Sequence, residues 1–401
     1  MRGRDRKNHG QTLARSAVHG TTRVGAALQA HTQPPAQVAA AFAAAPEPAQ
    51  PAVNGKPVLG VCPPPLDEPQ ELKPLDDGWC QWITDNALQR MPEGKMLETL
   101  KAAGVDVAQA SGFIASLPRN PMFRSAEKMR DRYERFGRVM QNVHSLQETP
   151  AHDRVEKRSH LSRDEFMERY VRGNRPVVIT DMARDWPAMT RWSFAEFKRR
   201  YGSMTVQVQA GREKDENFEV NKLQHKHTTN FAAFLDRVVM SGPNNDEYLT
   251  ANNELLRRPE FQGLLSDVGP LPDYCIQSDL ARCASLWVGP EGTKTPLHHD
   301  TLMLLHTQIV GRKRWRFVAP SYASRLYNDY DVYSPVNFEP LDVQRFPDAA
   351  KVKVLEVVVE PGETMFLPLA WWHQVTSLDK CISLSFTNID APNRFDFGNG
   401  H

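Results

Sequence analysis

The first part of the chain places apolar residues at helical spacing. Trp79, Trp82 and Ile83 stand at i, i+3 and i+4, which puts them on one face of a helix. The same spacing recurs further along, and residues 124–143 predict a longer, charged helix. We expect residues 76–150 to form a small packed helical unit. A module dedicated to binding a partner is the alternative that this pattern leaves open.

From about residue 155 the pattern changes to short helices and strands. Two Ser-x-x-Glu motifs, Ser162 with Glu165 and Ser193 with Glu196, predict capped helix starts. Short strands are predicted in between and after them, at residues 175–180, 204–209 and 247–251.

The C-terminal half is a series of short β-rich segments separated by Gly, Pro or Asp turns. They cover residues 283–289, 302–310, 313–319, 352–360, 364–369 and 381–388. Many short strands with such turns predict a sandwich or barrel rather than a doubly wound parallel sheet. The expected fold is therefore mainly β with flanking helices, in one domain over residues 155–395.

The beginning of the chain has a different composition. Up to residue 60 it contains only two acidic residues, Asp5 and Glu47, against seven Lys or Arg, and Ala and Pro dominate. Such a segment buries too little apolar surface to offset its ordering entropy. We expect a disordered or low-complexity tail over residues 1–75. Targeting to an organelle is not excluded, because transit peptides share this composition.

Bulk composition excludes several classes of protein. The 401 residues are 40% hydrophobic and 24% charged, with a formal net charge of +1, which favours neither nucleic acid nor a membrane surface as a partner. Five cysteines without a C-x-x-C pair predict no disulfide framework, so we expect a reducing, cytoplasmic location. No apolar run is long enough to span a membrane.

The segment "TPLHHD" carries the candidate chemistry. Residues i and i+2 of a strand point to the same face, so His298 and Asp300 can share one metal ion. One H-x-D pair is weak evidence and needs a third ligand, which "PGETMFLPLAWWHQV" supplies as His373. Two imidazoles and one carboxylate leave open the positions at which non-haem Fe(II) binds a cosubstrate and O2.

A lysine lies beyond the next turn. In "QIVGRKRWRF", Lys313, Trp315 and Phe317 share one face of a predicted strand. A buried lysine needs a partner, so an inward Lys313 predicts an anionic ligand such as the distal carboxylate of 2-oxoglutarate. A solvated basic run from Arg312 to Arg316 is the alternative.

Several motifs together resemble one family. In order, "RPVVITDMARDWPA", "WSFAEF", "TPLHHD", "QIVGRKRWRF", "PGETMFLPLAWWHQV" and "SLSFTN" are similar to the JmjC and cupin-like 2-oxoglutarate oxygenases, over a little more than half the chain. They resemble especially the protein-hydroxylase branch that includes the factor inhibiting hypoxia-inducible factor. The resemblance implies a double-stranded β-helix (jelly-roll) core that uses Fe(II), 2-oxoglutarate and O2, with succinate and CO2 as products.

The resemblance also assigns roles to individual positions. His298, Asp300 and His373 match the metal ligands, and Lys313 matches the lysine that binds the distal carboxylate. Three further residues match cosubstrate contacts, namely Thr295, Tyr248 and Asn388. One departure is Leu304, which stands where the branch often has asparagine.

Other functions stay open on the sequence. The expected substrate is a protein or peptide side chain, and a small molecule, a modified tRNA base or an N-methyl group is the alternative within the same chemistry. A non-catalytic cupin scaffold is the alternative outside it. His225 and His227 form a second possible metal pair, but no carboxylate follows them at the spacing of a metal motif. The oligomeric state is not predicted.

Overall fold

A computed structural model describes residues 72–148, 153–251, 253–278, 280–328 and 331–395. The predicted tail over residues 1–75 lies almost entirely outside them. The chain divides into two compact units, which meet in sequence between Pro118 and Arg119. Within the described residues, none of the helices combines the length and the apolar character that a membrane-spanning segment needs.

The first unit is built from three short helices around a small apolar core. They are α1 (Asp77–Leu88), α2 (Glu93–Ala102) and α3 (Val107–Ser116). Trp79, Ile83 and Leu100 are buried, as the helical spacing predicts. The Asp106 carboxylate accepts hydrogen bonds from two backbone N–H groups at the start of α3 and so caps this helix.

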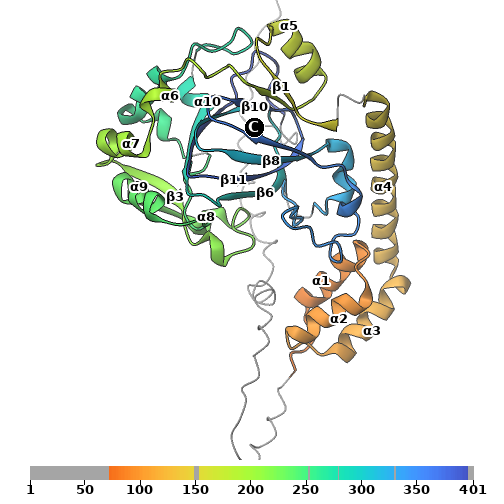
Figure 1. Cartoon of the computed structure of the whole chain (residues 1–401). Helices are drawn as coiled ribbons and strands as arrows, with labels where there is room; N and C mark the ends of the chain where they lie inside the picture. The colour runs from red at the N-terminus through yellow and green to blue at the C-terminus, as the bar shows by residue number, and fades with distance from the viewer. Residues whose placement is uncertain (1–71, 149–152, 252, 279, 329–330, 396–401) are drawn as a thin grey trace, which may run out of the picture. The chain divides into compact units, whose positions relative to one another are not determined.

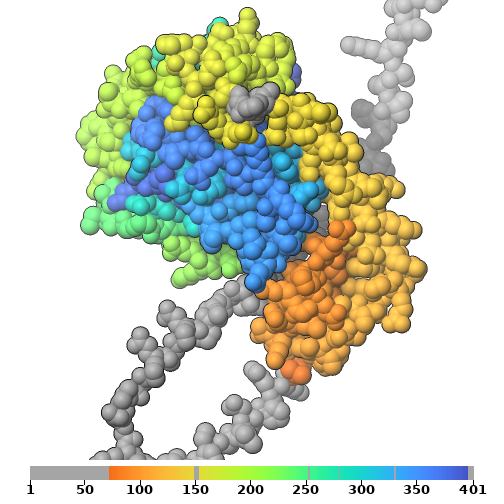
Figure 2. All heavy atoms as spheres, turned by 45° about the vertical axis from the view of Figure 1, so that its right-hand side comes forward, coloured from red at the N-terminus to blue at the C-terminus, as the bar shows by residue number. Residues whose placement is uncertain are grey.

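The long charged helix belongs to the second unit. It is α4 (Pro121–Gln147), and it packs on the short 3-10 helix η8 (Pro320–Arg325). Figures 1 and 2 show α4, in gold, beside blue segments of the C-terminal half. Gly137 makes this close approach possible, because a Cβ there would overlap the side chain of Ser324. The boundary at residue 118 therefore differs from the predicted helical unit over residues 76–150, since the contacts of α4 with distant residues could not be read from its own sequence.

Eight strands of the second unit form two facing sheets. They are β5 (Ala284–Gly289), β6 (Lys294–His299), β7 (Leu304–Val310), β8 (Lys313–Val318), β9 (Leu355–Val359), β10 (Thr364–Leu367), β11 (Trp372–Ser377) and β12 (Cys381–Phe386). One sheet has the order β6-β11-β8-β9. The other has the order β1-β2-β10-β7-β12-β5, where β1 (Glu156–Arg158) and β2 (Val177–Ile179) extend its edge. Because strands alternate between the sheets along most of the chain, this is the expected double-stranded β-helix.

Helices cover the outer face of the six-stranded sheet (Figure 1). They are α5 (Arg163–Glu165), which continues as a π-helix (Phe166–Arg172), then α6 (Ala188–Arg191), α7 (Phe194–Tyr201) and α9 (Phe231–Met240). Inside the barrel, Trp315, Phe317 and Met365 belong to one apolar cluster. The barrel is therefore packed along part of its interior, and the polar residues gather in the remaining space.

The predicted strand at residues 247–251 is not formed. Tyr248 and Leu249 make only isolated bridges, to Gln209 of β3 (Thr205–Gln209) and to Val288 of β5. β3 itself pairs with β4 (Lys226–Asn230), which follows α8 (Lys222–His225). These two bridges nevertheless fix the backbone at Tyr248, next to the strands that carry the candidate site.

We predict that Gly311→Ala destabilises the protein, because Gly311 makes the turn before Lys313 with φ +73°. An alanine Cβ would also overlap the carbonyl oxygen of Lys380. The free energy of unfolding, measured with denaturant, should fall by about 1–3 kcal/mol. Gly242→Ala is the matched control, since no atom lies within 4 Å of its added Cβ, and it should not destabilise. Equal stability of the Gly311 variant and wild type would contradict this interpretation of the turn.

Candidate active site

Two antiparallel strands bring the three predicted metal ligands together. His298 lies near the end of β6 and is paired with His373 of β11, and Asp300 follows directly after β6. Their ligand atoms all lie within 4.8 Å of one another. The Nε2 atoms of His298 and His373 are 3.9 and 4.0 Å from the two carboxylate oxygens of Asp300. Among the described residues, this is the one group of three such side chains placed to hold a metal ion.

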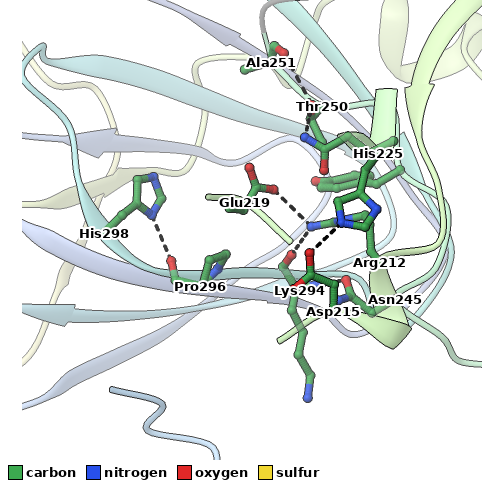
Figure 3. A network of polar contacts seen from close by, with 12 residues as sticks. Arg212, Asp215, Glu219, His225, Asn245, Thr250, Ala251, Lys294, Pro296 and His298 are labelled. Carbon is green, nitrogen blue, oxygen red and sulfur yellow. Dashed lines mark hydrogen bonds and ion pairs between the residues drawn. The ribbon is translucent and has the colours of Figure 1, made fainter. Parts of the chain in front are cut away.

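Backbone carbonyl groups orient both imidazoles. The Nδ1 atom of His298 is 2.9 Å from the Pro296 oxygen (Figure 3), and that of His373 is 3.0 Å from the Trp371 oxygen. A carbonyl oxygen only accepts hydrogen bonds, so each Nδ1 carries the proton. Each Nε2 is then left with a free lone pair directed at the other ligands, as metal binding requires.

The environment of Asp300 and His373 favours their neutral forms. Burial raises the pKa of the Asp300 carboxyl, although the nearby His298 lowers it. Burial also holds the pKa of His373 well below its usual range, and the proximity of His298 adds to this effect. A divalent cation between them would supply the positive charge that the carboxylate lacks.

Lys313 is buried in the same cavity, with 1% of its surface exposed. Its Nζ donates to Tyr248 Oη and Ser383 Oγ, each at 3.0 Å, and lies 3.4 Å from His306 Nε2. All three partners are neutral, and none of the acidic residues that the structure describes lies within ion-pair distance. Because an unpaired buried cation is costly, this arrangement indicates an anionic ligand.

The rest of the basic run points outward. Arg312 pairs with Asp379, and Arg316 pairs with Glu339 and Glu356. The arginines are therefore held in ion pairs outside the cavity, and the solvated alternative does not hold for Lys313. Strand alternation accounts for the difference, because β8 is buried at every second residue from Lys313 to Phe317.

Thr295 and Tyr248 line the cavity that holds the three ligands and Lys313, which has a volume of about 510 Å³. Thr295 faces inward although it is three residues before His298. The register between β6 and β11 shifts between these two positions, as in a β-bulge, and this changes the face on which the side chains point. Leu304, at the position where the resembling branch has asparagine, adds an apolar side chain to the wall.

Asn388 does not line this cavity, which corrects the prediction for that residue. Its Nδ2 donates to the Ile276 oxygen at 2.6 Å, on the other side of the chain. Ser385 and Thr387 line the cavity instead, because side chains along β12 and its extension alternate between two faces. The resemblance to the family, which assigned Asn388 to the cosubstrate, does not take this alternation into account.

Three residues of the site were not predicted from sequence. Trp287 of β5 lines the cavity and donates from Nε1 to Ser385 Oγ at 2.8 Å. His306 of β7 and Ser383 of β12 bind the Lys313 ammonium. Side chains alternate between the two faces of a strand, and this alternation could have identified these three residues once the Lys313 side chain was predicted to point into the barrel.

A buried arginine, Arg212, packs against the ring of Tyr248. The guanidinium of Arg212 lies 5.1 Å from the Tyr248 ring centre, and its Nη2 donates to Glu219 at 3.1 Å and to the Lys294 oxygen at 2.8 Å. Figure 3 shows the contacts of Arg212 with Glu219 and with Lys294. Nothing in the sequence around Arg212 predicts its burial.

The second possible metal pair is separated in the structure. Both nitrogens of His225 are engaged, with Asp215 at 2.8 Å and the Ala210 oxygen at 3.0 Å. His227 is exposed on β4. This pair therefore lacks the free, converging lone pairs of a metal site.

We predict that His306 makes the stability of the metal-free protein depend on pH. Burial, together with Lys313 and His373, holds the pKa of His306 well below its usual range. The unfolded state therefore binds a proton below about pH 6.5 while the folded state does not, and stability is lost as pH falls. In His306→Gln, the decrease in unfolding free energy below pH 6.5 should be shallower by up to about 1.4 kcal/mol per pH unit. An unchanged slope in denaturant unfolding would contradict this.

A comparison with protein families identifies the domain. A family model described as a cupin-like domain matches residues 163–387, which is more than half of the chain and includes all the strands of the site.

Curated relatives match the same region. The chain is 33% identical over 243 residues to lysine-specific demethylase JMJ30 of Arabidopsis thaliana, which covers 58% of this chain and 54% of the relative. It is 30% identical over 232 residues to lysine-specific demethylase 8 of Xenopus tropicalis, covering 56% and 50%. Arginine-specific demethylase JMJ20 of Arabidopsis thaliana is 28% identical over 272 residues, covering 58% and 56%.

The matched region spans about half the length of these relatives. The domain match, the jelly-roll core and the matching relatives agree on one assignment. The chain belongs to the cupin-like family, among the JmjC-type 2-oxoglutarate oxygenases.

Proposed function

We propose that this protein is an Fe(II)- and 2-oxoglutarate-dependent oxygenase that hydroxylates a C–H bond on a protein or peptide side chain. The observation that carries the proposal is one cavity holding both a His-Asp-His group and a buried lysine without a carboxylate partner.

The side chains fit the two groups that this activity needs. Two imidazole Nε2 atoms and one carboxylate suit Fe(II) and leave positions open. When bound, the iron and 2-oxoglutarate supply the oxidising chemistry, in which O2 and the cosubstrate yield succinate, CO2 and a hydroxylated product.

The chain itself contributes position and a dry pocket. Lys313 binds and orients the distal carboxylate of the cosubstrate, with the Tyr248 and Ser383 hydroxyl groups beside it. Trp287 and Leu304 line the cavity with apolar surface and so exclude water near the reacting atoms.

An N-methyl group is the second candidate for the site of hydroxylation. The names of the relatives favour it, since they are called lysine-specific or arginine-specific demethylases. Hydroxylation of an N-methyl carbon gives an unstable product that loses formaldehyde, so both candidates use the same first step. A small molecule or a modified tRNA base is compatible with the cavity but has no such support.

The test compares wild type with His298→Ala and His227→Ala. After anaerobic loading with Fe(II), succinate formation from 2-oxoglutarate under air is measured. We expect wild type to form succinate even without a prime substrate. His298→Ala should form it more than about 100-fold more slowly, because this variant lacks one of the three metal ligands. His227→Ala should match wild type, since His227 is exposed and outside the site.

Equal rates for wild type and His298→Ala would contradict the proposal. If wild type forms no succinate, the metal-to-ligand charge-transfer band of the anaerobic Fe(II) and 2-oxoglutarate complex decides. Absence of that band would favour a non-catalytic cupin scaffold. Mass spectrometry of a substrate then separates a stable gain of one oxygen from the loss of a methyl group.

A further inference from the structure

Among the residues that the structure describes, the lining of the active-site cavity has more basic than acidic side chains near its rim. Four exposed charged side chains line it, namely Lys222, Glu254, Arg257 and Arg282. Half-buried Lys226 and Glu219 lie further in. The cations come from separate segments, α8 and β4 on one hand and η6 (Leu255–Arg257) with α10 (Leu280–Cys283) on the other.

The acidic residues of this rim are already paired. Glu254 lies 2.9 Å from Arg257, and Glu219 lies 3.1 Å from the buried Arg212. Asp300 and Lys313, deeper in the cavity, are the residues for the metal and the cosubstrate. No negative charge of the described lining is therefore left for a cationic substrate.

Two lysines are in the opposite situation. None of the acidic residues that the structure describes lies within ion-pair distance of the Lys222 or Lys226 ammonium groups. Lys222 Nζ lies 6.0 Å from the centre of the Tyr333 ring, and that ring stacks on the ligand His298 at 5.8 Å and 25°. The Lys222 charge therefore stands one aromatic ring away from the metal site.

We propose that the prime substrate is an acidic polypeptide segment, whose carboxylate or phosphorylated side chains beside the reacting residue pair with Lys222 and Lys226. This inference rests on the proposed function and names the substrate class of the same site. Charges at the mouth of a low-dielectric cleft attract ligands of the opposite sign and repel those of the same sign. A nucleic acid is the less favoured polyanion, because the chain has a formal net charge of only +1 and phosphate backbones need many basic contacts.

The test measures binding of three fluorescent probes to protein loaded with Mn(II) and 2-oxoglutarate. Two are peptides of equal length that differ only in having Glu or Lys around a central neutral residue, and the third is a single-stranded oligouridine. The variants are the double substitution Lys222→Glu with Lys226→Glu and, as a control, Lys198→Glu with Lys351→Glu. The control changes the net charge equally, at exposed lysines outside the cavity.

We expect wild type to bind the Glu peptide at least about tenfold more tightly than the Lys peptide at low salt. The rim variant should lose this preference, and the control should retain it. Three results would overturn the inference: no binding of the Glu peptide or no preference for it, an equal loss in the control, or tighter binding of the oligouridine that depends on the rim lysines.

A second readout separates this inference from the proposed function. Binding of 2-oxoglutarate and its uncoupled conversion to succinate are measured in the same three proteins, and the control variant should match wild type in both. If wild type and the control prefer the Glu peptide, the rim variant does not, and none of the three binds 2-oxoglutarate, the oxygenase proposal fails and the acidic-peptide surface stands. If 2-oxoglutarate binds normally and the peptide preference is absent, only the substrate class is wrong.

Discussion

The Lys313 ammonium group is a positive charge buried inside the barrel, and the polar residues of the active-site cavity are arranged around it. Two hydroxyl groups and one neutral imidazole accept its hydrogen bonds, which orients the group but leaves its charge unbalanced. Burying a charge costs several kcal/mol unless an opposite charge accompanies it. A dicarboxylate cosubstrate would balance it, with one end chelating the metal and the other end on Lys313.

The metal ligands depend on strand pairing over a long distance in sequence. His298 and His373 are direct partners across β6 and β11, and the carbonyl groups of Pro296 and Trp371 fix their tautomers. Both orienting groups belong to the backbone of the strands themselves. The geometry is therefore built by the barrel, and a side-chain substitution outside the ligands leaves these hydrogen bonds in place.

Sequence patterns predicted the parts of the site that follow a local period. The i, i+2 spacing of His298 and Asp300 and the inward face of Lys313 both follow from strand alternation, and the structure confirms them. Asn388 was assigned by resemblance to the family, and its side chain lies on the face of the chain opposite to Ser385 and Thr387, which line the cavity. The burial of Arg212 behind Tyr248 depends on contacts between segments distant in sequence, which no local pattern contains.

The helical region shows the same limit. The apolar spacing around Trp79 predicted the helices, but the division at residue 118 depends on the packing of α4 against η8. The family match covers residues 163–387, and membership of a family does not by itself fix the substrate.

The most direct measurement is the affinity for 2-oxoglutarate of wild type and Lys313→Met, each loaded anaerobically with Fe(II). A charge-assisted hydrogen bond contributes about 1.5–3 kcal/mol, so we predict that the variant binds 2-oxoglutarate about ten- to a hundredfold more weakly. Its Fe(II) affinity should be unchanged, which shows that the site is folded. Equal affinity of the two proteins for 2-oxoglutarate, with Fe(II) bound in both, would contradict the central claim that the Lys313 ammonium group binds the distal carboxylate of the cosubstrate.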